Sequence, residues 1–127
     1  MAIKYHQAED IRKIAEEIVN ILNWNHIQLN DVGFLRSTGS SSRGTIARCH
    51  ALGKAMQLAL NRKGFYLIEI ISERFDKLPE NEKIKVIIHE LMHIPFCFGG
   101  GFKHHNIVNE KNIKNVFEHY QKLRNKK

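Results

Sequence analysis

The sequence is poor in cysteine and proline and has no long apolar run. Its two cysteines, Cys49 and Cys97, are far from CxxC spacing, which excludes a disulfide framework and a cysteine zinc ribbon. No apolar run approaches the roughly 20 residues that cross a bilayer. The first six residues also lack the apolar core of a secretory signal. We therefore expect a single domain over residues 1–127, located in the cytoplasm and without a membrane partner.

Positive charge is concentrated in two segments of the chain. The formal net charge is +7. Residues 37–64 contain five basic and no acidic residues, and residues 91–127 contain seven basic and two acidic residues. Two basic segments raise the hypothesis of weak nucleic-acid association, although no RNP, zinc-finger or helix-turn-helix signature accompanies them. The alternative is a solvated surface that keeps the protein soluble.

The motif that carries most chemical information is HExxH at residues 89–93. Residues four apart lie on one helical face, so His89 and His93 can bind the same metal ion. Glu90 follows the first ligand, where a carboxylate can take a proton from a metal-bound water. These three residues are the minimal apparatus of a zinc metallopeptidase.

The sequence around the motif predicts a buried helix. Residues 84–88 are mostly apolar, as expected for core-facing turns. Pro79 and Glu80 are typical of a helix start, and Pro95 ends the helix just after the motif. A rigid core helix suits metal ligands. The alternative interpretation is a core helix that carries histidines without binding a metal.

A catalytic zinc needs a third protein ligand and an open position for water. The glycines at 99–101 permit a tight reversal of the backbone, which allows His104 or His105 to approach the metal. Glu110 and Glu118 fit solvated helix faces better than a thermolysin-type ligand position. The residues alone leave the choice between the two histidines open.

Residues 66–71, 78–95 and 99–105 resemble the phage-type metallopeptidase family and, more distantly, the SprT-like zincins. In that family a strand with an acidic residue precedes an HEL-x-HI-P helix, and a glycine-bearing loop with a third histidine follows. Lys103 matches the basic residue near the end of this loop, His104 replaces its proline, and His105 matches its ligand histidine. The resemblance implies one Zn²⁺ per monomer, bound by His89, His93 and His105.

The expected fold is α+β and zincin-like, a minimal metallopeptidase domain. A small mixed or antiparallel sheet packs against an N-terminal helix, the HExxH helix and a C-terminal helix. Apolar spacing predicts helices at 7–22 and 106–124 and strands at 26–36 and 65–71. Residues 45–60 fit either a helix or strands, and the resemblance favours strands at 45–51 and 56–60. It also implies that strand 65–71 lies at the sheet edge and pairs with substrate. On such a strand Glu69 would either contact substrate or face water, and we favour the second.

The sequence therefore predicts a hydrolase that cleaves a peptide or protein substrate, with Glu90 as general base. Candidates for a further oxyanion or substrate contact are Tyr66, Lys103, His104 and Arg48. The runner-up is a catalytically idle zinc-binding domain that docks on nucleic acid or a protein partner through its basic surface. Glu90 argues against this alternative, because a structural zinc site needs no base.

Overall fold

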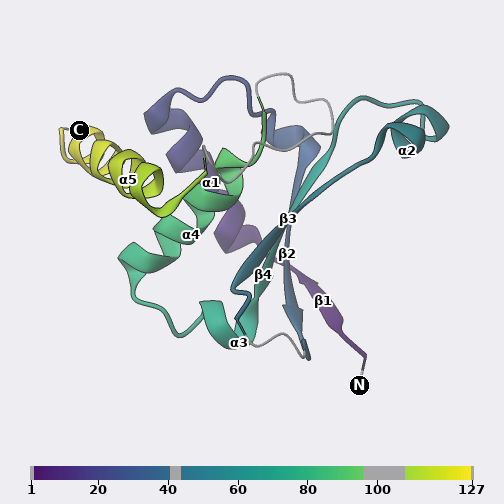
Figure 1. The fold of residues 1–127 in the computed structure, drawn as a ribbon, viewed down its shortest axis with the longest axis horizontal. Helices are drawn as coiled ribbons and strands as arrows, with labels where there is room; N and C mark the ends of the chain where they lie inside the picture. The colour runs from purple at the N-terminus through teal and green to yellow at the C-terminus, as the bar shows by residue number, and fades with distance from the viewer. Residues whose placement is uncertain (1, 41–43, 96–107, 127) are drawn as a thin grey trace.

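The fold is a mixed four-stranded sheet with three long helices on one of its faces (Figure 1). The computed structural model describes residues 2–40, 44–95 and 108–126. This architecture confirms the predicted α+β class with a mixed sheet. Helices α1 and α4 contact the sheet, whereas the main contacts of α5 are with α1 and α4. No helix in the described ranges is both long and apolar enough to cross a membrane.

The sheet has the order β1-β2-β4-β3, so β4 is a central strand. Strand β2 pairs parallel with β4, whereas β1 with β2 and β3 with β4 pair antiparallel. The strands span Lys4–Gln7 (β1), Val32–Thr38 (β2), Ala47–Ala51 (β3) and Tyr66–Ile71 (β4). The expectation that residues 65–71 form an edge strand is therefore wrong. Among the described strands, β3 is the one at the edge next to β4.

The long helices are α1 (Glu9–Leu22), α4 (Glu80–Met92) and α5 (Glu110–Asn125). Their apolar faces pack together and against the side chains that β4 directs to the same side. Burial of this apolar surface is the main stabilising contribution to the fold. The fully or nearly fully buried residues include Ile11, Ala15, Ile18, Tyr66, Ile68, Ile70, Ile84, Ile87, Ile88, Leu91, Phe117 and Tyr120.

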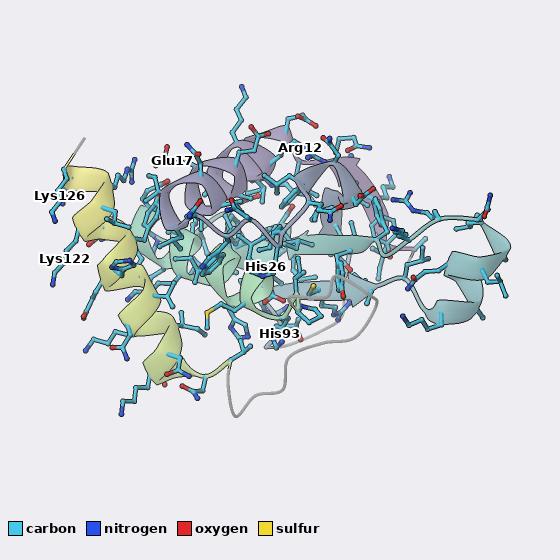
Figure 2. The ribbon with its side chains drawn as sticks, turned by 90° about the horizontal axis from the view of Figure 1, so that it is seen from above. Arg12, Glu17, His26, His93, Lys122 and Lys126 are labelled. Atoms are coloured by element: carbon cyan, nitrogen blue, oxygen red, sulfur yellow. The ribbon has the colours of Figure 1, made fainter. Side chains whose placement is uncertain are left out.

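Residues 54–59 form a short helix, α2 (Lys54–Ala59), which corrects the predicted strand at 56–60. These residues are strong helix formers without β-branched side chains. Helix α2 lies at one extreme of the molecule in both views, away from the other helices (Figures 1 and 2). None of its residues is buried, and Leu58 keeps 84% of its surface exposed.

Two further elements complete the described chain. A single 3₁₀ turn at Leu29–Asp31 precedes β2, so the strand predicted at 26–36 begins later and continues to Thr38. A four-residue helix, α3 (Ser72–Phe75), follows β4 and places Phe75 in the core. Helix α5 begins where Asn109 Oδ1 accepts a hydrogen bond from the backbone N–H of Asn112 at 3.0 Å. Asn109 is therefore the N-cap residue of α5.

Candidate metal and catalytic site

Helix α4 carries His89 and Glu90 of the HExxH motif, and His93 is its C-cap residue. Its core side holds Ile87, Ile88 and Leu91, none of which has exposed surface. These anchors fix the rotation of the helix, so that His89 and His93 share a partly exposed face. The two imidazole centroids are 5.1 Å apart, with ring planes inclined by 40°.

Glu90 is buried between this histidine face and the core. Only 7% of its surface is exposed. Burial raises the pKa of its carboxyl group from 4.5 to about 7, because an apolar environment disfavours the charged form. A carboxyl group with a pKa near neutrality is suited to take up and release a proton at ordinary pH.

A small cavity of about 270 Å³ lies over these residues. Its walls are His89, Glu90 and Val86 on α4 and the segment 44–47, which leads into β3. Strand β3 turns Cys49 toward the same region, where the thiol is largely shielded from water. This burial raises the pKa of Cys49 to about 12, and the negative charge of Glu90 adds to the shift. Cys49 is therefore a protonated, largely buried thiol near the cavity rather than a thiolate ligand.

The donor set on α4 suits a zinc ion. Two neutral imidazoles one helical turn apart are a recurrent pair of zinc ligands, each binding at about 2.0–2.1 Å. Within residues 2–40, 44–95 and 108–126, no cluster of three or more His, Cys, Asp or Glu residues that could hold a metal is present. The candidate third ligands His104 and His105, together with Lys103, lie outside the described residues.

Two other candidates for substrate contact lie away from the cavity. Tyr66 is fully buried at the start of β4 and has no exposed surface with which to contact a substrate. Arg48 lies on the sheet face opposite the helices, with Nη1 4.0 Å from Oε2 of Glu69. Neither side chain lines the cavity, and a role of either in substrate contact remains a prediction.

Glu69 is the feature that sequence reasoning placed wrongly. It is 2% exposed rather than facing water, and its carboxylate accepts a hydrogen bond from Ser37 Oγ at 2.6 Å. His50 Nε2 lies 2.8 Å from its other oxygen. His50 thus points away from α4 and is not a partner of the metal ligands. A lone carboxylate within the apolar run 65–71 was the available signal for a buried, partnered acid.

The two basic segments lie at opposite ends of the described molecule. Helix α2 marks one end, and Lys122 and Lys126 on α5 mark the other (Figures 1 and 2). Two of the basic residues are also neutralised locally: Arg62 pairs with Asp31 at 2.6 Å, and Arg124 with Glu17 at 3.0 Å. Among the described residues, the basic side chains of the two segments therefore do not form one continuous face. Nucleic-acid binding remains a prediction.

The described elements define an α+β protein with an HExxH helix packed against one face of a mixed sheet. Residues 3–123 match the model of the family described as "Putative phage metallopeptidase". The chain belongs to this putative phage metallopeptidase family. No curated protein and no solved structure gives a significant match. The likeness to SprT-like zincins remains a prediction.

Proposed function

We propose that this protein is a zinc-dependent metallopeptidase in which His89, His93 and His105 bind the metal and Glu90 is the general base. The observation that carries the proposal is the position of Glu90. It is a buried carboxyl group with a pKa of about 7, next to a pair of imidazoles on the same helix, and it opens into a cavity. Membership of a family described as metallopeptidases supports the same chemistry.

A zinc ion at these imidazoles supplies a water of lowered pKa and polarises the carbonyl of the scissile bond. The residues of the chain perform the proton transfers. One carboxylate oxygen of Glu90 takes the proton from the attacking water and then delivers it to the nitrogen of the leaving amine. The walls of the cavity limit water around this carboxylate, which keeps its pKa close to the pH at which it must exchange protons.

The substrate backbone is proposed to lie along β3. In the described part of the chain this strand pairs only with β4, and the segment leading into it forms one wall of the catalytic cavity. An extended peptide can add to such an edge through main-chain hydrogen bonds. This placement transfers to β3 the substrate-pairing role that the sequence had assigned to residues 65–71.

Metal content and peptide cleavage by the Glu90→Gln variant test the proposal. The variant should retain about one zinc per chain while turnover falls roughly 10²–10⁴-fold, the usual contribution of a general base. Glu80→Gln on the same helix is the matched control, because Glu80 lies exposed in the first turn. Glu80→Gln should cleave as the wild type does. Undiminished cleavage by Glu90→Gln would show that Glu90 is not the base.

A further inference from the structure

A second, larger hollow opens beside the catalytic cavity. It is a groove of about 450 Å³ between α4 and α5, within the size range of about 300–1,000 Å³ typical of ligand pockets. Its α4 wall includes Glu82 and Val86 and ends at His89. His89 lies seven positions after Glu82 on the helix, so the groove follows α4 for about 10 Å.

The groove and the catalytic cavity share three wall residues, Ile46, Val86 and His89. The two hollows therefore meet at the proposed metal ligand. A peptide whose scissile bond lies over His89 and Glu90 has a neighbouring side chain within reach of the groove. Ile46 is also fixed relative to the sheet, because its carbonyl accepts a hydrogen bond from the Ile71 N–H at 2.9 Å.

The chemistry of the groove favours an apolar occupant. Four of its lining residues are apolar, namely Ile46, Leu78, Val86 and Ile113, and Ile113 retains only 9% exposure. Apolar walls of this kind recognise side chains by the area they remove from water.

Charged residues of both signs also line the groove. Two acids and two lysines contribute: Glu82, Lys85, Glu110 and Lys114. Lys85 is already engaged, with Nζ 3.6 Å from Glu82 Oε2 and 5.0 Å from the centroid of the Phe117 ring. The acidic and basic residues that line the groove are equal in number, so their charges do not favour an acidic or a basic side chain of the substrate.

We propose that this groove is the specificity subsite of the enzyme and receives one bulky apolar side chain, of the size of Leu, Met or Phe, next to the scissile bond. The assignment of a scissile bond rests on the proposed function, whereas the affinity of the groove for an apolar side chain does not. The substrate class is thus a peptide or unfolded segment that exposes a large apolar residue.

Cleavage of two matched peptides tests the subsite. One is a decapeptide of Gly, Ser and Ala with a single central Phe, and the other carries Ala in place of Phe. Zinc-loaded protein should cut beside Phe, as mapped by mass spectrometry, with kcat/KM at least tenfold higher than for the Ala peptide. Ile113→Phe enlarges one of the residues that line the groove and should lower this ratio at least tenfold. Val116→Phe, the same type of change on α5 but outside the groove, should leave the ratio unchanged.

A binding measurement separates failure of the subsite from failure of the peptidase. Methyl NMR of isoleucine-labelled protein reports on Ile46 and Ile113 during titration with N-acetyl-phenylalaninamide or N-acetyl-alaninamide. Shifts with the Phe compound alone support the groove even if no peptide is cleaved, in which case only the peptidase proposal falls. Cleavage without preference for Phe would contradict the proposed subsite and would support the peptidase proposal. Absence of both cleavage and shifts overturns the subsite.

Discussion

The Nε2 atom of His50 lies 2.8 Å from Oε1 of Glu69 and joins the edge strand β3 to the central strand β4. Ser37 on β2 donates to the other oxygen of the same carboxylate. One buried acid thus links three strands, including the strand that borders the catalytic cavity. Burial alone acts to raise the pKa of Glu69, but the hydrogen bonds from Ser37 and His50 and the charge of Arg48 outweigh it. The pKa is therefore lowered below its usual 4.5.

Replacing Glu69 with Gln should destabilise the fold by about 1.5–3 kcal/mol at pH 7, the usual worth of a buried hydrogen bond to a charged group. Because the folded-state pKa of Glu69 is lowered, its contribution is present above pH 4.5 and is lost as the pH falls below that value. Urea denaturation at pH 7 and pH 3.5 measures both effects. Glu16→Gln, an exposed position on α1, is the control. Equal stability of Glu69→Gln and wild type at pH 7 would contradict the role of this network.

The acid limb of the pH–rate profile should reflect the ionisation of the Glu90 carboxyl group. Burial raises the pKa of this carboxyl group to about 7 in the absence of metal. A bound cation favours the carboxylate, so the midpoint of kcat/KM for the zinc enzyme should lie below 7. Activity should rise with pH up to that midpoint, because only the deprotonated base accepts a proton. An acid limb with its midpoint above pH 7 would assign the limb to another group.

Metal-free protein should become less stable relative to Glu90→Gln as the pH rises. The folded state holds the Glu90 proton up to about pH 7, whereas the unfolded chain releases it near 4.5. Deprotonation between these values favours unfolding, by about 3 kcal/mol in total. Denaturation with a chelator present, at pH 4.5 and pH 8, measures this difference. If the difference in free energy of unfolding between the two proteins is the same at pH 4.5 and pH 8, the carboxyl group of Glu90 is solvated.

His105→Ala should lose bound zinc, whereas His104→Ala should retain it. Removing one of three ligands weakens the site far more than removing a neighbouring residue does. Elemental analysis after dialysis gives the metal content per chain, and circular dichroism shows whether each variant is folded. Loss of zinc only with His104→Ala would assign the third ligand to His104 instead.

The motif at residues 89–93 and the long helices were predictable because the sequence patterns that indicate them are local. Chemistry-bearing residues at HExxH spacing, and apolar residues three and four apart, depend only on neighbours along the chain. The same holds for β4, a run of six residues that includes Ile68, Ile70 and Ile71. Its central place in the sheet was not predictable, since strand order depends on pairings between distant segments.

The elements that were missed have exposed side chains or distant partners. Strand β1 has four exposed polar or aromatic residues, and only its pairing with β2 defines it. Helix α2 is too short for its spacing to distinguish it from a strand. Glu69 is buried by partners that lie 32 and 19 residues away, Ser37 and His50. The groove at Ile113 likewise depends on how α5 docks against α4.

The buried position of Glu90 also has an evolutionary consequence. Folding by itself disfavours a carboxyl group at this position, because the charged form loses its water on a helix that is otherwise packed with isoleucine and leucine. Selection for the proposed catalytic role of Glu90 would oppose its replacement. In descendants of this chain released from that selection, position 90 should drift toward glutamine or an apolar residue, while Ile87, Ile88 and Leu91 persist because the fold still requires them.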